Sequence, residues 1–170
     1  MSERVLVIAS GNAGKIREFS SLLQNLPVRI EPQPVGIQVE ESGNTFRDNA
    51  LLKAQAVAKA TGHWALADDS GLCVDALGGA PGVFSARYAD SDLERIQRLL
   101  RELGDCTNRN ARFSAALCIA APDGRTLAEV EGHCEGLITF CTRGDQGFGY
   151  DPVFEVKNSG LTFAEMSLEN

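Results

Sequence analysis

The sequence has no surplus of basic residues. Its 16 Lys and Arg are outnumbered by 23 Asp and Glu, which gives a formal net charge of −7 at pH 7. Affinity for the phosphate backbone of nucleic acid depends on an excess of Lys and Arg, so this charge argues against a general nucleic-acid binder. It remains compatible with one small anion held by a few placed cations.

Long hydrophobic runs and paired cysteines are also missing. The apolar run 5–9 is far shorter than a signal peptide, and no later segment approaches the roughly 18 consecutive apolar residues of a membrane span. The five cysteines are odd in number and lack the close spacing of a zinc site or a disulfide framework. We therefore expect a soluble, cytoplasmic protein with free thiols.

Histidine and nucleophile motifs are equally scarce. The only histidines, His63 and His133, lack the spacing of a catalytic dyad or metal site, so we expect structural roles for both. Ser70 lies outside a Gly-x-Ser-x-Gly motif, and we assign it substrate contact at most. Without repeats, low-complexity tracts or linkers, the 170 residues predict one compact domain.

What is present alternates between strand and helix patterns. Strands are predicted at 4–9, 35–41 and 64–67, and helices at 16–26, 45–62 and 93–103. Two longer strand patterns, 111–121 and 126–140, flank Pro122-Asp123-Gly124, which predicts a hairpin. Together these elements predict an α/β fold with a mixed sheet.

The turn Ser10–Lys15 lies between a predicted strand and a predicted helix. Backbone N–H groups and the helix dipole favour anions at such a place, which suits a phosphate. The turn is not a P-loop, because Gly11 and Gly14 are too close together and Ile16 stands where a metal-binding Ser or Thr would be. An ordinary connection is the alternative interpretation.

Two acidic pairs lie at the ends of predicted elements. Glu40-Glu41 precedes a helix, and Asp68-Asp69 ends a strand. Mg²⁺ selects carboxylate oxygens and keeps positions for substrate phosphates, so two carboxylates from separate segments could form its site. Helix-start charge is the alternative for the first pair. The second pair needs a cation or donor to offset its repulsion.

Two further segments suggest substrate contacts. Asn49 and Lys53 share a helix face because they are four residues apart, although a solvated lysine is the alternative. The segment Gly147–Pro152 carries two aromatic rings and a carboxylate on a loop. Such a loop could stack on a base and bond its edge, or could be a turn whose rings pack in the core.

Six segments together resemble the inosine/xanthosine triphosphate pyrophosphatase family. These segments are Ser10–Lys15, Glu41–Phe46, Asn49–Ala54, Ala67–Leu72, Gly78–Tyr88 and Gly147–Pro152. Their order and approximate spacing match the family pattern from Val5 to about Leu168, and the combination is highly specific.

The resemblance implies an elongated two-lobed α/β fold with a central mixed sheet flanked by helices, and an active site in the cleft between the lobes. It also implies a homodimer and Mg²⁺-dependent hydrolysis of inosine, deoxyinosine or xanthosine triphosphate to the monophosphate and pyrophosphate. Glu41 and Asp69 would hold the metal, with Asp69 also the catalytic base. Substrate contacts would come from Ser10, Gly11, Asn12, Ala13, Gly14, Lys15, Lys53, Ser70, Phe148, Gly149, Tyr150 and Asp151.

The sequence departs from the family pattern in two places. The stretch between Tyr88 and Phe113 is shorter than usual, and residues 1–170 lack the lysine, the Ser-His-Arg motif and the last helix that normally follow. The alternative function is therefore a weakly active or inactive relative that only binds nucleotides. A phosphatase using an aspartyl-phosphate is disfavoured, because Ser70 replaces the second acid of its Asp-x-Asp motif.

Overall fold

The computed structural model describes residues 3–167 of the chain. Leu168, to which the family resemblance is expected to extend, lies outside this range. Contacts between Cα atoms divide the chain into two compact units. Unit 1 comprises residues 1–69 and 115–131, and unit 2 comprises residues 70–114 and 132–170. The single domain expected from the length of the chain stays a prediction.

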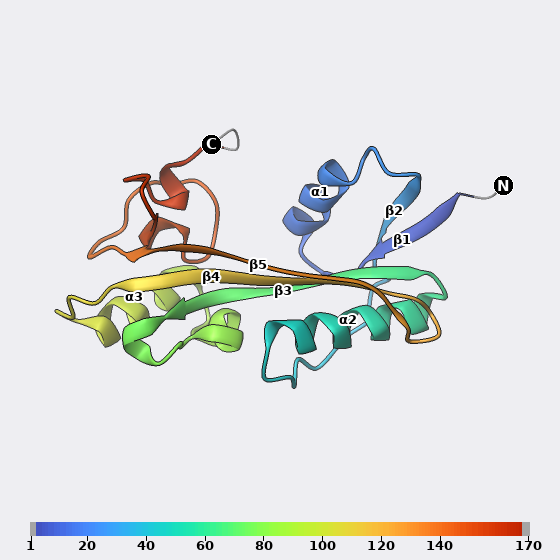
Figure 1. Cartoon of the computed structure of the whole chain (residues 1–170), viewed down its shortest axis with the longest axis horizontal. Helices are drawn as coiled ribbons and strands as arrows, with labels where there is room; N and C mark the ends of the chain where they lie inside the picture. Colours follow the sequence, from blue (N-terminus) through green and yellow to red (C-terminus); the bar gives the residue numbers. More distant parts are fainter. Residues whose placement is uncertain (1–2, 168–170) are drawn as a thin grey trace. The chain divides into compact units, whose positions relative to one another are not determined.

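The structure is mixed α/β, as predicted from the sequence (Figure 1). The strands are β1 Arg4–Ile8, β2 Val28–Pro32, β3 Trp64–Val74, β4 Asn110–Ala120, β5 Thr126–Ile138 and β6 Phe154–Val156. The α-helices are α1 Ala13–Leu22, α2 Phe46–Thr61 and α3 Asp92–Leu103, and the short 3₁₀ helices are η1 Asp75–Leu77, η2 Gly82–Arg87, η3 Asp151–Val153 and η4 Phe163–Glu165.

The six strands form one sheet in the order β2-β1-β3-β4-β5-β6. Strand β1 is parallel to both β2 and β3, whereas β6 is antiparallel to β5, so the sheet is mixed. Among the described residues no helix is long and apolar enough to cross a membrane.

The alternation of side chains along the strands builds two cores in unit 1. Successive residues of a strand point to opposite faces. One face of β1 and β3 packs on α2 through the cluster Val5, Val7, Ala9, Ala50, Ala54, Val57, Ala58, Ala65 and Ala67. The other face packs on α1 through Leu6, Ile8 and Leu66, with Ile16, Phe19 and Leu23 against them. Figure 1 shows the two helices on opposite sides of these strands.

Helix α2 is defined by strong signals at both ends. The Thr45 hydroxyl accepts a hydrogen bond from the Asp48 N–H (3.1 Å) at the N-terminus. Gly62 ends the helix in the left-handed conformation at φ 70°, which glycine adopts without steric cost. Between the caps, Ala50, Ala54 and Val57 share one fully buried face. The helix is therefore fixed in position against the sheet.

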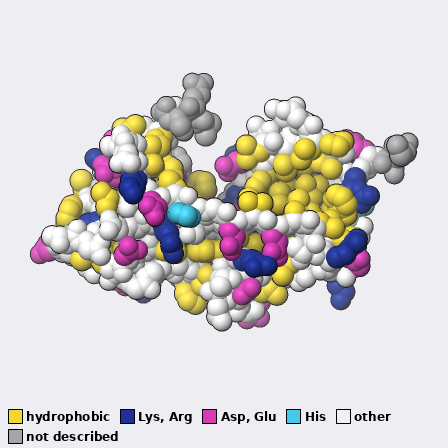
Figure 2. Space-filling view, viewed as in Figure 1, with side chains coloured by type: hydrophobic (Ala, Val, Ile, Leu, Met, Phe, Trp, Pro, Cys, Tyr) yellow, Lys and Arg dark blue, Asp and Glu magenta, His cyan; other side chains and the backbone are white. Residues whose placement is uncertain are grey.

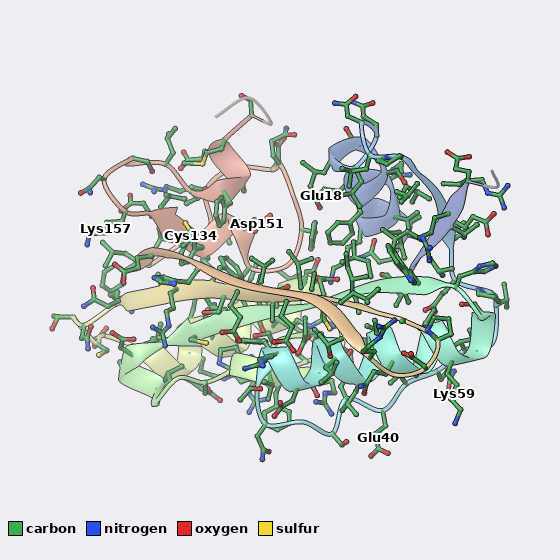
Figure 3. The ribbon with its side chains drawn as sticks, turned by 45° about the vertical axis from the view of Figure 1, so that its right-hand side comes forward. Glu18, Glu40, Lys59, Cys134, Asp151 and Lys157 are labelled. Atoms are coloured by element: carbon green, nitrogen blue, oxygen red, sulfur yellow. The ribbon has the colours of Figure 1, made fainter. Side chains whose placement is uncertain are left out.

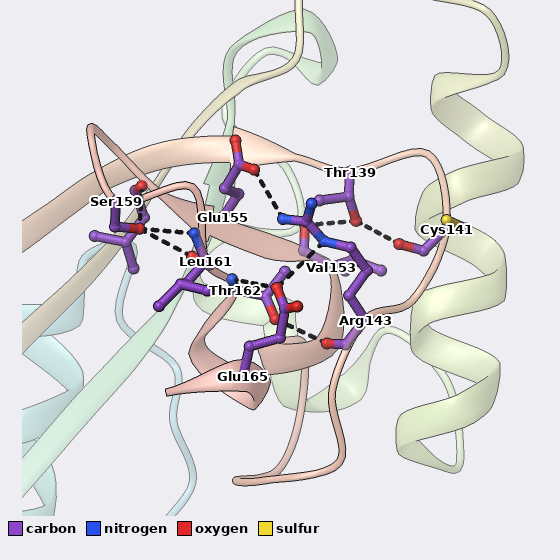
Figure 4. Close-up of polar contacts among 10 residues, drawn as sticks. Thr139, Cys141, Arg143, Val153, Glu155, Ser159, Leu161, Thr162 and Glu165 are labelled. Atoms are coloured by element: carbon purple, nitrogen blue, oxygen red, sulfur yellow. Dashed lines mark hydrogen bonds and ion pairs between the residues drawn. The ribbon is translucent and has the colours of Figure 1, made fainter. Parts of the chain in front are cut away.

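Unit 2 has its own core around buried Leu99, Val153 and Phe154. Phe113 packs edge-on against Phe154, with ring centroids 4.6 Å apart. Polar contacts of Arg143 hold the segment that follows β6 (Figure 4). Its guanidinium pairs with Glu155 (2.8 Å) and Glu165 (3.3 Å).

An apolar groove of about 220 Å³ lies on the surface of unit 1. Side chains of α1, β3, β4 and β5 line it, among them Phe19, Leu22, Leu117 and Val130. Leu22 and Val130 are 71% and 59% exposed. Figure 2 shows hydrophobic side chains gathered on this face of the unit. Exposed apolar surface of this kind is unusual in a single subunit.

Two predicted elements differ from the structure. No strand forms at 35–41, because β2 occupies the position beside β1 and Val35 is fully exposed. The strand predicted at 64–67 instead continues to Val74, since the alternation after Gly71 belongs to the same strand. Asp68 and Asp69 therefore lie inside a strand and not at its end, as the sequence had suggested.

Candidate functional site

Asp69 lies at the centre of the polar residues of unit 1. It is buried within β3, with 7% of its surface exposed. Burial raises the pKa of its carboxyl above the usual value, and the nearby charges of Glu41 and Asp68 raise it further. Lys53 and Asn49 act in the opposite direction and favour the ionised form. The charges of Lys53 and Glu41 thus act on the Asp69 carboxyl, and a metal site formed by Glu41 and Asp69 stays a prediction.

Lys53 and Glu41 form an ion pair next to Asp69. The Nζ atom of Lys53 is 3.3 Å from Oε1 of Glu41, and the Lys53 side chain is only 16% exposed. This pairing excludes the interpretation of Lys53 as a freely solvated lysine. Glu40, in contrast, is exposed and points away from α2 into solvent (Figure 3). Only the second member of the pair Glu40-Glu41 thus belongs to the site.

Lys15 forms a second, partly buried ion pair with Asp68. The distance from Nζ to Oδ2 is 3.0 Å, and the Asp68 side chain is 12% exposed. Asp68 and Asp69 point to opposite faces of β3, because Leu66 packs on the α1 side and Ala67 on the α2 side. Asp68 therefore pairs with Lys15 in the first turn of α1. The ammonium group of Lys15 is the cation that offsets the repulsion between the two adjacent carboxylates.

The Lys15–Asp68 ion pair lies near the end of β1. The last paired residue of β1, Ile8, stands opposite Leu66 of β3. The chain then turns away into Ser10–Lys15, so β1 does not extend alongside Asp68 and Asp69. Ligands of parallel sheets bind beyond such carboxyl ends of strands. An anion placed here could reach cations from both faces of the sheet.

The turn Ser10–Lys15 has fewer free amides than its sequence suggests. Asn12 caps α1, and its Oδ1 accepts hydrogen bonds from the N–H groups of Gly14 (2.9 Å) and Lys15 (3.3 Å). The Asn12 N–H in turn donates to the Ser10 hydroxyl (3.0 Å). A phosphate at this turn would have to replace these side-chain acceptors or bind through Lys15.

The side chains around Asp69 suit a hard divalent cation. No group of three or more His, Cys, Asp or Glu positioned to hold a metal occurs within residues 3–167. However, Oδ2 of Asp69 is buried without a hydrogen-bond donor from any described residue. A buried carboxylate oxygen without a partner is costly, and a cation would satisfy it. Mg²⁺ needs only one or two protein carboxylates when phosphates and water complete its shell.

Unit 2 carries the loop predicted to contact the base. Phe148 is 63% exposed, and its N–H donates to Oδ2 of Asp151 (3.1 Å). Burial raises the pKa of Asp151, and the hydrogen bond from Phe148 opposes that shift. The N–H of Gly149 donates to Asp92 at the start of α3 (3.0 Å). These bonds fix the loop and leave one aromatic ring available for stacking.

Tyr150 supports the loop from within. Its side chain is buried in the core of unit 2, and its hydroxyl donates to the Ser85 carbonyl (2.7 Å). Tyr150 therefore agrees with the second interpretation of this loop, in which an aromatic ring packs in the core. Ser70 is exposed at the first position of unit 2.

Three of these contacts were not identified from the sequence. The sequence presents Asp68 only as one of an acidic pair and Asn49 only as sharing a face with Lys53, and it gives no signal for Asp92. If the strand is extended past Asp69, the alternation of side chains predicts that the two aspartates point to opposite faces. The bond between Asp92 and Gly149 joins positions 57 residues apart and leaves no local signal.

Comparison with known proteins places this arrangement in a family. The model of the Ham1 family matches residues 6–170. A dITP/XTP pyrophosphatase of Synechococcus sp. (strain CC9311) is 80% identical over 170 residues, which are 100% of this chain and 82% of the relative. A dITP/XTP pyrophosphatase of Prochlorococcus marinus (strain MIT 9313) is 64% identical over 169 residues, or 99% of this chain and 83% of that protein.

Solved structures agree with the sequence comparison. A HAM1 protein from Coxiella burnetii superimposes with a TM-score of 0.89 at 41% identity, covering 98% of this chain and 88% of the other. The Ham1 protein of Staphylococcus aureus gives a TM-score of 0.88 at 41% identity, with the same coverage. Because sequence, fold and the full length of the match all agree, this chain is a member of the Ham1 family.

Proposed function

We propose that this chain hydrolyses nucleoside triphosphates that carry a non-standard purine, such as deoxyinosine or xanthosine triphosphate. The products are the nucleoside monophosphate and pyrophosphate, and the role is removal of these nucleotides from the cellular pool. The names of the relatives that are 80% and 64% identical support the substrate class. The observation that carries the proposal is the buried Asp69 of β3, together with the ion pairs Lys15–Asp68 and Lys53–Glu41.

Glu41 and Asp69 are proposed to hold a divalent cation, Mg²⁺, against the phosphates. When bound, the metal neutralises phosphate charge and polarises the group under attack. The uncoordinated Oδ2 of Asp69 and the exposure of about a third of the Glu41 side chain favour these two ligands.

Lys15 and Lys53 neutralise the triphosphate. Each lysine is held by a carboxylate in the structure, at 3.0 Å for Lys15 and 3.3 Å for Lys53. Phosphate oxygens then replace these partners, and both ammonium groups stabilise charge that develops in the transition state. The ion pairs keep the two lysines oriented before substrate arrives.

Asp69 is proposed as the base. Water attacks the α-phosphorus while the carboxylate takes its proton, and pyrophosphate leaves as the bond between the α and β phosphates breaks. Burial raises the pKa of Asp69 towards the operating pH, and a base with such a pKa accepts the proton more effectively. The Phe148–Asp151 loop is proposed to contact the purine, with Phe148 as its stacking ring.

Base selection should follow from hydrogen bonding. A 6-oxo purine accepts a bond where adenine has an amino donor, and a buried unpaired donor costs about 1–3 kcal/mol. That range corresponds to a preference of up to about a hundredfold in kcat/KM. A homodimer in the cytoplasm, with no nucleic-acid or membrane partner, completes the proposal.

A panel of nucleoside triphosphates, assayed for pyrophosphate with and without Mg²⁺, tests the function. We expect release from deoxyinosine and xanthosine triphosphates that depends on the metal and is lost in Asp69→Asn. Equal kcat/KM for adenosine triphosphate would contradict base selection. Tight nucleotide binding without pyrophosphate release would instead support the non-catalytic alternative.

A further inference from the structure

We propose that Asn49 is a positioning residue that holds Glu41 and Asp69 in the geometry needed to share one cation. The proposal rests on the proposed function, because it takes those two carboxylates as the ligands. Asn49 itself would touch neither the metal nor the substrate. Its part would be to connect the loop that carries Glu41 with the strand that carries Asp69.

The orientation of the Asn49 amide follows from one hydrogen bond. Asn49 is fully buried on α2, and its Oδ1 accepts from the N–H of Gly43 at 2.7 Å. A backbone N–H can only donate, so the atom facing it must be the oxygen. The Nδ2 group is consequently directed away from Gly43.

The Asn49 contact fixes the loop just after Glu41. Gly43 follows Glu41 by two residues and packs so closely that a Cβ there would lie 2.7 Å from Asn49 Oδ1 and 2.7 Å from the Asp48 Cβ. Only glycine permits this approach. The backbone beside Glu41 is thus held against α2, and α2 is fixed by its buried face.

Asp69 lies on the face of β3 that packs on α2, and Asn49 is buried on that helix. Yet neither Nδ2 of Asn49 nor Oδ2 of Asp69 completes a hydrogen bond with a described residue. A buried donor on α2 and a buried acceptor on the strand packed against it therefore both lack a hydrogen bond. Buried polar groups of native proteins are normally paired, so these two need a further explanation.

A ligand-holding role explains this arrangement. Groups that hydrogen-bond metal-binding carboxylates orient them, and changing such a group typically lowers metal affinity about 10- to 100-fold. Asn49 is suited to this task because one amide serves both carboxylate segments.

The test measures metal binding directly, by electron paramagnetic resonance titration of Mn²⁺ into the full chain without nucleotide. We expect Asn49→Ala and the similarly branched but apolar Asn49→Leu to raise the Kd for Mn²⁺ about 10- to 100-fold. With metal saturating, kcat should recover towards the parent value, whereas at limiting metal it should stay low.

Two control variants separate positioning from general destabilisation. Val57→Ala removes buried volume from the same face of α2, and Asn108→Ala removes an asparagine whose Oδ1 accepts the N–H of Asn110 in unit 2. Both should bind Mn²⁺ as the parent does. If Asn49→Ala does not fold, Asn49→Leu decides the question. A Kd within about twofold of the parent in a folded Asn49 variant overturns the proposal.

The outcomes distinguish this inference from the proposed function. If the parent chain binds no Mn²⁺ and releases no pyrophosphate, the proposed function fails. If the parent binds the metal and the folded Asn49 variants bind it equally well, the proposed function stands and the role of Asn49 is refuted.

Discussion

Two neighbouring aspartates have different surroundings in this structure. Asp68 faces α1 and is neutralised by Lys15, whereas Asp69 faces α2 and keeps a buried oxygen without a donor. The pKa of Asp69 is raised chiefly because burial disfavours its charge. Asp68 thus holds the ammonium group of Lys15, whereas the Oδ2 atom of Asp69 is available to a bound cation.

The raised pKa of Asp69 predicts a pH-dependent gain in stability for Asp69→Asn. Between the unfolded pKa near 3.8 and the raised folded pKa, the folded state binds more protons than the unfolded state, so stability falls as pH rises through this window. We expect Asp69→Asn without metal to unfold at higher urea than the parent at pH 7, and the gain to vanish below about pH 4. An equal difference at pH 7 and pH 3.5 would contradict this cause.

Lys15 provides a second prediction at the residue scale. Hydrogen bonds to charged groups contribute about 1.5–3 kcal/mol, so Lys15→Met should lower kcat/KM for deoxyinosine triphosphate about 10- to 100-fold. Arg17→Met is the matched control, since Arg17 is exposed on the same helix. If both variants lose activity equally, the effect comes from net charge and not from the place of Lys15.

Among the elements, α2 has the greatest effect on the site. Its buried face packs on the sheet, and the same helix carries Asn49 and Lys53. Strand β3 matters for a related reason, because its unbroken course directs Asp68 and Asp69 to opposite faces. The helix and the strand together decide which charges meet.

The N-terminal cap of α2 should therefore affect both stability and activity. Thr45→Ala removes the acceptor for the Asp48 N–H and should lower the free energy of unfolding by about 1 kcal/mol. Ser91→Ala removes the corresponding cap of α3, where Ser91 accepts from the Glu94 N–H, and should cost a similar amount. We expect only the Thr45 variant to raise the Kd for Mn²⁺. Urea unfolding and metal titration of both variants measure the two effects.

At the scale of the whole molecule, each unit has a hydrophobic core of its own. The candidate residues divide between them, with the lysines and carboxylates in unit 1 and the Phe148–Asp151 loop in unit 2. Each unit supplies residues that the proposed function assigns to the substrate. Binding should then stabilise the folded chain as a whole.

This expectation can be measured by thermal unfolding with Mg²⁺ and an uncleavable α,β-methylene analogue of deoxyinosine triphosphate. A ligand at about 100 times its Kd stabilises the folded state by about 2.7 kcal/mol, which should appear as a clear rise in Tm. The adenosine analogue at the same concentration should give a smaller rise. Equal shifts for the two analogues would contradict a base-selective pocket.

Much of this protein could be predicted from its sequence. The cap at Thr45, the stop at Gly62 and the hairpin turn at 122–124 are local signals, and the elements they bound lie where expected. The six family segments likewise identify the chain, because their residue types and order are properties of the sequence alone. The mixed α/β class follows from the same patterns.

Only the tertiary structure decided which residues meet. The direction of Asp68 and Asp69 depends on whether they lie in a strand and on which helix covers each face, and neither fact is local. The burial of Asn49 and Tyr150 depends in the same way on partners distant in sequence. Sequence thus set the kinds of charge available to the site, whereas packing of the helices on the sheet paired each lysine with one carboxylate, because a side chain can bond only to what its face of the strand or helix presents.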